Sequence, residues 1–442
     1  MKKSCVVIPI ETTSRELNSK IFLACKLAES NITVFLGTKT FAQKISNYIN
    51  NVVYIDKGYH QNISDKIYSE LKKNKCSIIL LDEENGVDLE DFKMLDYRIP
   101  DQIIKIFDMI FLWGKKQDEY LKQNRKNYNI NKFYITGHPR FDLLTEEFRI
   151  FYNKKINKIK NKYSNFILFA SDNKFANNIN SRKSVIKNYL NRYNDLNFWI
   201  SYSEKLHKKN YELIKKICKK TNYNVIIRPH PEEKKSTYID LYKDFKDRVH
   251  VVYDDSSIFW ILSAEFIIIN HSTTGVESSM LGKQTISYTP FKLERNSFPY
   301  LPIKCSENFS DPSLLIKRLL NKKVKLKQYH KIFEEFFNYN KNSIQSIEKI
   351  NLLLTKNYKF HFSFKKKFKF LIFLLISKYY NLKIFLKKIT GNLIIDKLTE
   401  NKLSEMNSKH VTKKFNEISK LMKLKRNIKL KKINEHLYCF KS

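Results

Sequence analysis

The alternation of short apolar runs with longer amphipathic ones in the N-terminal third of the chain constrains its fold most strongly. The apolar runs have the length of buried strands, and helical patterns such as Glu16–Ser30 lie between them. This rhythm is typical of a parallel sheet flanked by helices, and it predicts a doubly wound domain of nucleotide-binding type. The expected strands are Cys5–Ile10, Thr33–Leu36, Val52–Ile55, Ser77–Leu81, Met109–Leu112 and Lys132–Thr136.

A second alternation of the same kind begins at Phe166–Phe169, after a lysine-rich stretch with helical spacing between Glu146 and Tyr163. At 442 residues the chain exceeds one ordinary core. We therefore predict an α/β protein with two Rossmann-like domains facing across a cleft, the GT-B arrangement, with the ligand at the carboxyl ends of both sheets. The further expected strands are Asn224–Ile227, His250–Val252, Phe266–Ile269 and Thr285–Tyr288, with helices around Glu204–Thr221, Ile258–Ala264 and Gly275–Leu281.

The positive charge of the chain is concentrated near its C-terminus. The formal net charge is +38, and residues 351–442 alone hold 23 lysine and arginine residues against 5 aspartate and glutamate residues, a net +18. Because the rest is a diffuse lysine- and asparagine-rich background, we expect no nucleic-acid partner. The expected domains are residues 1–150 and 160–330, both Rossmann-like, and residues 331–442, a basic helical extension.

The segment Phe364–Ile389 is the part of this extension whose pattern is most informative. Lys365, Lys366, Lys367 and Lys369 precede the apolar run Phe370–Ile376, and Tyr379, Tyr380, Phe385, Lys387 and Lys388 follow it. Seven apolar residues are too few to span a bilayer, which needs about 20. The pattern favours an interfacial helix on an anionic membrane. A helix packed onto the first domain with a solvated basic face is the alternative.

Two further features indicate a cytoplasmic protein on the inner face of the membrane. The six cysteines are scattered without CxxC pairs, as expected of reduced thiols in a reducing compartment. The first apolar run, Val6–Ile10, is too short for a signal peptide and suits a buried strand.

An acidic string follows one of the expected strands of the first domain. Ser77–Leu81 leads directly into Asp82, Glu83 and Glu84, with Gly86 shortly after. Crowded carboxylates raise one another's pKa, so one of the three could take a proton from a sugar hydroxyl. The alternative is a helix N-terminus that favours negative charge.

A proline-framed histidine follows an expected strand of the second domain. After Asn224–Ile227 come Arg228 and His230, with a proline on either side of the histidine. Both side chains can hold phosphate, and the prolines fix the loop. A purely structural histidine is the alternative.

A hydroxyl-rich loop leaves the strand Phe266–Ile269. Ser272, Thr273 and Thr274 precede Gly275, where a helix is expected to begin, and Glu277 lies in its first turn. Free N–H groups and hydroxyls make an anion site for a nucleotide phosphate, and Glu277 could accept hydrogen bonds from a ribose. The alternative is an ordinary N-cap.

A second His-Pro pair lies at the end of the first domain, in Gly137–Leu144. His138 competes with His230 for the phosphate role, but its place near the linker favours a structural turn, a hinge or an acceptor-side contact, shared with Arg140. The chain has no GxGxxG at the first strand, no Walker loop, no HExxH and no DxD, so we expect a metal-independent transfer without a cofactor.

Taken together, these strings resemble the bacterial surface carbohydrate biosynthesis protein family. The resemblance runs in order from about Met1 to Pro290. It rests on Pro9–Thr12 with Arg15–Leu17, Leu81–Glu84, Phe111–Gly114, Gly137–Leu144, Arg228–Pro231 and Ser272–Gly275.

That family looks like a GT-B relative of the bacterial sialyltransferases and capsule Kdo transferases. The resemblance implies that Asp82, Glu83 or Glu84 is the base, that His230 contacts the CMP phosphate, and that the loop Ser272–Thr274 holds the same phosphate. Glu11 and Arg15, in the opening motif, would serve the acceptor or the hinge. Two departures stand out: Asn85 precedes Gly86, and His138 replaces an expected Asn.

The expected function is transfer of a sugar to a surface polysaccharide or lipopolysaccharide acceptor. The donor expected is a CMP-activated ulosonic acid such as Kdo or a sialic-acid-like sugar. Residues 1–150 would bind the acceptor and residues 160–330 the nucleotide-sugar donor. The alternatives are a CDP-glycerol-type polyol-phosphate transferase of the teichoic acid kind and a non-enzymatic membrane scaffold.

Overall fold

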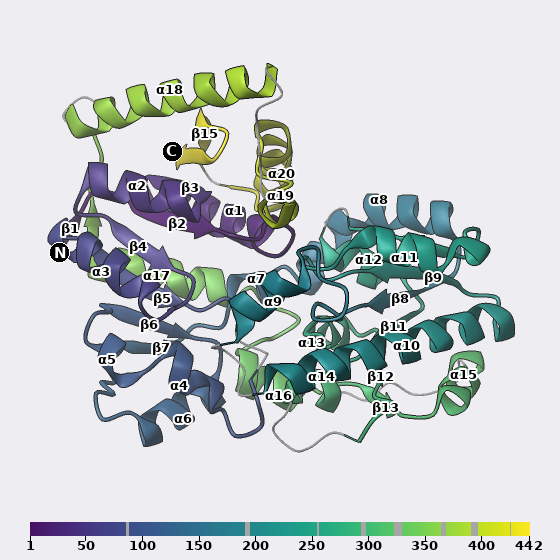
Figure 1. Ribbon diagram of the computed structural model, residues 1–442. Coiled ribbons are helices and arrows are strands. Elements are labelled where there is room, and N and C mark those ends of the chain that lie inside the picture. The colour runs from purple at the N-terminus through teal and green to yellow at the C-terminus, as the bar shows by residue number, and fades with distance from the viewer. Residues whose placement is uncertain are drawn as a thin grey trace.

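A computed structural model describes Met1 to Ser442 except for residues 85–87, 191–194, 254–255, 293–297, 322–328, 364–367, 390–396 and 425. Its described strands form two large sheets, one in each lobe of the molecule, and one two-stranded pair (Figure 1). The first sheet has the order β15-β16-β3-β2-β4-β5-β6-β7, and the second has the order β10-β9-β8-β11-β12-β13. Asn85, Gly86 and Lys365–Lys367, which were part of the sequence argument, lie outside the described residues.

The first sheet confirms the strands predicted for the N-terminal third, with ends that differ by one or two residues. Its six N-terminal strands are parallel. All five residues of β2 are buried, as expected of a strand covered on both faces. The strands are β2 (Val6–Ile10), β3 (Val34–Thr38), β4 (Val53–Asp56), β5 (Ser77–Leu81), β6 (Met109–Leu112), β7 (Phe133–Ile135), β15 (Lys429–Asn434) and β16 (Leu437–Lys441).

The second sheet is parallel throughout, and its first five strands were predicted. The sixth strand, β13, was not predicted, because it is a three-residue edge strand with the polar sequence Glu-Asn-Phe. The strands are β8 (Phe166–Ala170), β9 (Asn224–Arg228), β10 (Val249–Val251), β11 (Phe266–Ile269), β12 (Gln284–Tyr288) and β13 (Glu307–Phe309). The separate pair consists of β1 (Lys2–Lys3) and β14 (Lys359–Phe360).

Helices cover both sheets. Those of the first lobe are α1 (Thr13–Glu29), α2 (Lys39–Ile49), α3 (Ile63–Lys73), α4 (Met94–Arg98), α5 (Asp101–Ile104), α6 (Lys115–Asn124) and α7 (Pro139–Asp142). The helix α8 (Glu146–Tyr163) leads into the second lobe, which holds α9 (Arg182–Tyr189), α10 (Leu196–Lys220), α11 (Lys235–Leu241), the 3-10 helix η1 (Lys243–Phe245), α12 (Ser257–Ser263), α13 (Thr274–Met280), α14 (Tyr300–Lys304) and α15 (Pro312–Leu320).

The chain then returns to the first lobe and stays there (Figure 1). This part contains α16 (His330–Phe337), α17 (Ser346–Asn357), α18 (Phe368–Ile389), α19 (Lys397–Lys402) and α20 (Ser408–Leu421). The carboxylate of Asp142 fixes the start of α17, accepting backbone N–H groups from Gln345, Ser346 and Ile347 at 3.2, 3.2 and 2.8 Å. The described helices include none with the length and hydropathy that a bilayer crossing demands.

The C-terminal extension contributes strands as well as the expected helices. β16 pairs antiparallel with β3, and β15 pairs antiparallel with β16. A Cβ placed on Gly37 in β3 would lie 2.6 Å from the carbonyl oxygen of His436, so only glycine permits this approach. The sequence analysis did not predict these strands, because the lysine-rich β15 has the composition of a solvated segment.

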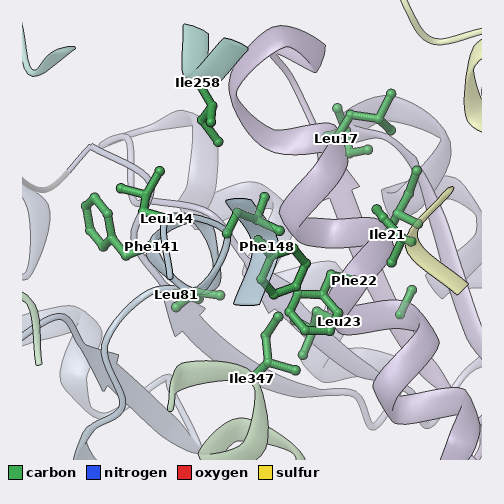
Figure 2. Packing of buried hydrophobic residues seen from close by; sticks show 14 of the residues in the cluster. Leu17, Ile21, Phe22, Leu23, Leu81, Phe141, Leu144, Phe148, Ile258 and Ile347 are labelled. Carbon is green, nitrogen blue, oxygen red and sulfur yellow. The ribbon is translucent and has the colours of Figure 1, made fainter. Parts of the chain in front are cut away.

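The main core is continuous from one lobe to the other. Figure 2 shows Phe22 and Leu23 of α1 beside Phe148 of α8 and Ile347 of α17, with Leu17 and Ile21 farther along the same helix. The rings of Phe22 and Phe148 have centroids 4.9 Å apart. Because α8 also packs along α12, this cluster joins the helices of both lobes.

Candidate active site at the domain interface

The three carboxylates after β5 lie in different surroundings. Asp82 and Glu83 are buried, whereas the side chain of Glu84 is 46% exposed. The carboxyl end of β5 therefore presents one of the three acidic side chains to solvent and keeps the other two inside the protein.

Glu83 belongs to a buried network of charges. Lys20 Nζ lies 3.0 Å from Glu83 Oε1 and 2.7 Å from Glu16 Oε2, and His138 Nε2 lies 3.4 Å from Glu83 Oε2. Burial alone would raise the pKa of Glu83, but Lys20, His138 and Lys57 outweigh it and hold the pKa well below its usual range. The cavity that these side chains line measures about 10 Å³, room for one water molecule at most. In this conformation it has no room for a sugar ring.

Asp82 shapes the turn that follows β5. Its Oδ1 accepts the backbone N–H of Glu84 at 3.1 Å, and its Oδ2 lies 3.4 Å from Arg98 Nη1. The indole N–H of Trp113 donates to the Asp82 carbonyl oxygen at 2.7 Å. These contacts hold Asp82 in place from three sides.

Glu84 is paired with Arg15, from the first turn of α1. Arg15 Nη2 donates to Glu84 Oε1 at 2.7 Å. The positive charge of Arg15 is the main reason that the pKa of Glu84 lies well below its usual range. Glu84 is therefore ionised at neutral pH, and it is the one carboxylate of the three whose side chain is partly exposed.

Glu11 lies at the end of β2, on the same edge of the sheet. Lys57 Nζ lies 3.1 Å from its Oε2, and Lys402 Nζ of α19 lies 3.9 Å from its Oε1. Burial alone would raise the pKa of Glu11, but Lys57 and Lys402 lower it to about 2. Glu11 thus ties the first sheet to the C-terminal extension, and its acceptor or hinge role remains a prediction.

The two His-Pro loops have the same local hydrogen bond. His138 Nδ1 accepts the backbone N–H of Arg140 at 3.2 Å, and His230 Nδ1 accepts the backbone N–H of Glu232 at 3.2 Å. In the neutral form each ring therefore carries its proton on Nε2. Their surroundings differ, because His138 is only 1% exposed and its Nε2 points to Glu83, whereas His230 is partly exposed. In this conformation His138 has no access to a substrate.

Burial keeps His230 neutral. It lowers the pKa of His230 to about 4, and the charges of Lys174 and Arg15 act in the same direction, against Asp172 and Glu232. A neutral ring with its proton on Nε2 is a hydrogen-bond donor at neutral pH. This form can donate a hydrogen bond to the oxygen of a leaving phosphate.

Glu233, which the sequence analysis missed, organises the His230 loop. Its Oε1 accepts the backbone N–H groups of His230 and Asn173, both at 3.0 Å. Its Oε2 accepts the hydroxyl of Ser171 at 2.9 Å and also that of Tyr238. Glu233 thereby joins the loops that follow β8 and β9. The two adjacent acidic residues after Pro231, Glu232 and Glu233, were the sequence feature that could have indicated this role.

The hydroxyl loop after β11 is turned back on itself. Thr274 donates its backbone N–H to Ser272 Oγ at 3.3 Å, and Ser272 Oγ donates to Thr274 Oγ1 at 3.1 Å. Thr273 is the residue before α13, which begins at Thr274, one residue earlier than predicted. A Cβ on Gly275 would lie 2.4 Å from Ile269 Cδ1, so a larger residue here would push the end of the Ile269 side chain aside. The three hydroxyl residues are partly exposed.

His271 and Asp172 are further polar residues of the second lobe that the sequence analysis missed. The ring Nε2 of His271 lies 3.0 Å from the hydroxyl of Tyr202. Burial lowers the pKa of His271 to about 4, and the negative charge of Asp172 opposes this shift. Each follows a buried strand, β11 and β8 respectively, which is the signal that could have identified them.

Arg140 and Glu277 connect the two lobes. Arg140 Nη2 donates to Glu277 Oε1 at 2.6 Å, and Ser257 Oγ donates to Glu277 Oε2 at 3.2 Å. The Arg140 guanidinium also lies over the Trp113 ring, 5.5 Å from its centroid. Glu277 is thus engaged by two partners, and its ribose contact remains a prediction.

Arg15 links the acidic edge of the first sheet to the histidine loop of the second. It contacts Glu84 directly, and its charge contributes to the lowered pKa of His230. Arg228, at the end of β9, lies over the ring of Tyr253, 5.8 Å from its centroid. Burial raises the pKa of Tyr253, whereas Ser14 and Arg15 of the first lobe lower it. The structure thus brings Arg15, Glu84, Arg228 and His230 to one interface, with Glu83 and His138 buried below it.

Comparison of the sequence with models of known families gives no match, and comparison with curated proteins gives none. Solved structures do match. A histidine-to-alanine variant of the wall teichoic acid polymerase TagF has a TM-score of 0.54 at 13% identity, over 81% of this chain and 89% of that chain. The UDP-GlcNAc 2-epimerase of Methanocaldococcus jannaschii, in complex with UDP-GlcNAc and UDP, has a TM-score of 0.51 at 15% identity, over 81% of this chain and 100% of that chain.

At this level of identity the likeness establishes the fold. The chain has a GT-B fold of two Rossmann-like domains with a C-terminal extension, as the sequence predicted. The relation to sialyltransferases and Kdo transferases remains a prediction, because neither sequence comparison gives a match.

Proposed function

We propose that this chain is a metal-independent glycosyltransferase that moves a sugar from a nucleotide-sugar donor to a surface polysaccharide or lipopolysaccharide acceptor. The fold supports this proposal, because the solved structures that share it include TagF soaked with CDPG and an epimerase holding UDP-GlcNAc and UDP. In this proposal residues 1–150 bind the acceptor and contribute Arg15 to the donor site, residues 160–330 bind the rest of the donor, and residues 331–442 attach the protein to a membrane.

The observation that carries the proposal is that Arg15, which contacts Glu84 at 2.7 Å, is also close enough to His230 for its charge to lower the pKa of that ring. The positive charge of Arg15 lowers the pKa of both Glu84 in the first domain, which is ionised, and His230 in the second, which is neutral. A transferase of this fold needs a base on the acceptor side and a hydrogen-bond donor on the leaving-group side. Glu84 and His230 have the charge states that these two roles demand.

We assign the base to Glu84. The acceptor hydroxyl attacks the anomeric carbon and gives its proton to Glu84 while the bond from that carbon to the phosphate oxygen breaks. As this bond breaks, the Nε2–H of His230 donates a hydrogen bond to the phosphate oxygen that takes up the negative charge, and Arg228 and the hydroxyls of Ser272 to Thr274 hold the same group. Arg15 must leave Glu84 for an anionic group of the donor before Glu84 becomes basic enough to act.

An anionic donor sugar fits this exchange best. A carboxylated sugar such as Kdo or a sialic-acid-like sugar, activated by CMP, supplies both a carboxylate and a phosphate for the cations at the interface. The name of TagF favours a second candidate, a CDP-glycerol-type polyol-phosphate transferase of the teichoic acid kind. A non-enzymatic membrane scaffold is the third.

A thermal-shift panel of nucleotides and nucleotide sugars tests the proposal. A ligand that binds the folded chain raises its melting temperature. We expect CMP and CMP-sugars to give the largest shifts. A larger shift with CDP-glycerol would favour the polyol-phosphate reaction. If no nucleotide shifts the melting temperature, the non-enzymatic membrane scaffold is the candidate that agrees with the result.

A further inference from the structure

The helix α18 has one buried face and one exposed apolar face. Phe370 and Phe373 are buried, and their rings pack near Phe35 of β3 and Tyr48 of α2, with centroids 5.8 and 5.4 Å away. Figure 1 shows α18 along the outer margin of the first lobe, next to α2. The helix is therefore docked on the protein by one side only.

The exposed face carries six large apolar side chains. Among the described residues 17 such side chains are exposed, and α18 alone holds Leu371, Leu375, Ile376, Tyr379, Leu382 and Leu386. Five of the six follow the spacing of a single helix face. At about 100° per residue, Leu371, Leu375, Tyr379, Leu382 and Leu386 fall within an arc of roughly 80°. Scattered exposed leucines need no explanation, but a continuous apolar stripe marks an interaction surface.

Exposed basic residues lie on the same helix and on a neighbouring strand. Lys369 and Lys378 of α18 are exposed, and so is Lys429 on β15, a strand that packs against α18. Residues 351–442 as a whole carry a net charge of +18. A second copy of this chain would bring two such basic surfaces together at the stripe, which opposes self-association. An anionic bilayer matches both the apolar stripe and the surrounding lysines.

We propose that α18 lies in the plane of an anionic bilayer, with the stripe from Leu371 to Leu386 inserted among the acyl chains and the flanking lysines at the head groups. This inference refines the membrane attachment put forward above and names the face that makes it. It does not depend on the transfer chemistry. Because Phe370 and Phe373 remain packed on the first lobe, the helix binds the membrane without leaving the protein.

Co-sedimentation with lipid vesicles tests this inference. The probe is the full chain with vesicles of phosphatidylglycerol and phosphatidylcholine, and with vesicles of phosphatidylcholine alone. The variant Leu375→Gln/Leu382→Gln/Leu386→Gln removes the centre of the stripe. A matched control, Leu314→Gln/Leu320→Gln/Leu352→Gln, changes three leucines of similar exposure on α15 and α17.

We expect the stripe variant to bind anionic vesicles at least about tenfold more weakly, since each inserted leucine contributes strongly to transfer from water. The control should bind within about twofold of the wild type, and wild-type binding should weaken with salt and on uncharged vesicles. Both variants should keep the wild-type melting temperature and its shift with nucleotide, which separates this inference from the proposed transferase activity.

Equal binding of the stripe variant and the wild type would overturn the inference. So would a change of oligomeric mass in light scattering, from dimer in the wild type to monomer in the stripe variant, with vesicle binding unchanged. In that case the stripe would be a contact between two copies of the chain.

Discussion

Replacing Glu83 by glutamine distinguishes the buried carboxylate from the one that we assign to catalysis. Glu83 is 1% exposed and lies 3.0 Å from the ammonium group of Lys20, and glutamine keeps its shape while removing the charge. Loss of one partner from a buried ion pair costs about 3–5 kcal/mol. Lys20 retains its contact with Glu16 at 2.7 Å, so we take the lower end, about 3 kcal/mol.

That loss corresponds to a fall in melting temperature of roughly 6–12 °C for a domain of this size. The matched change Glu84→Gln should lower it by no more than about 4 °C, because the pair with Arg15 is partly exposed and such pairs contribute about 1 kcal/mol or less. Differential scanning fluorimetry at neutral pH measures both values.

The loss of transfer activity should be larger for Glu84→Gln than for Glu83→Gln, the opposite of the order for melting temperature. We expect Glu84→Gln to lower transfer by about 10²-fold or more, the size of a general-base contribution, while Glu83→Gln below its melting temperature stays within about tenfold of the wild type. A Glu83→Gln protein as stable as the wild type would refute the buried network. A Glu84→Gln protein with full activity would refute the assignment of the base.

Three other changes test separate parts of the site. Burial raises the pKa of Glu233 to about 7, so the stability that this residue contributes is complete below about pH 4.5 and is lost as the pH rises through about 7. In melting curves the wild type should therefore be less stable at about pH 8 than at about pH 5, and Glu233→Gln should abolish this difference. Identical pH profiles for the two proteins would contradict the prediction. Arg140→Ala removes the 2.6 Å contact with Glu277 between the lobes and should lower the free energy of unfolding, measured with denaturant, by about 1.5–3 kcal/mol. The control Arg182→Ala should lower it by about 0.5 kcal/mol or less, because the ion pair of Arg182 is exposed. His230→Ala should lower donor hydrolysis and transfer by about 10²–10³-fold with little change in melting temperature, and unchanged turnover would exclude His230 from the phosphate role.

Much of the fold could be predicted because the strands of a parallel sheet are buried on both faces. Runs such as Val6–Ile10 and Phe266–Ile269 therefore consist almost entirely of apolar residues and stand out in the sequence. Two of the four edge strands, β13 and β15, could not be found in this way because their sequences are polar, whereas β7 and β10 at the other two edges were predicted. The insertion of β16 beside β3 depends on a contact between residues about 400 positions apart, which no local pattern reveals.

The candidate site was predicted as a set of loops but not as a set of roles. Strand ends identified the acidic string and the loop around His230, since parallel strands bring their carboxyl ends to one edge. The sequence could not rank Asp82, Glu83 and Glu84, because burial and the approach of Lys20 decide their charge states. It favoured His230 over His138 for the phosphate role only from their positions in the chain, since their local hydrogen bonds are the same and the difference in burial is tertiary.

Calorimetric titration of CMP into the wild type, Arg15→Gln and His230→Ala tests most directly whether both domains hold one nucleotide. Arg15 belongs to the first domain and His230 to the second, and each should contribute a charge-assisted or strong hydrogen bond to the same ligand. We predict that each variant binds CMP at least about tenfold more weakly, with Arg182→Gln as the unaffected control. Wild-type affinity in either variant, or no nucleotide binding by the wild type, would contradict the account.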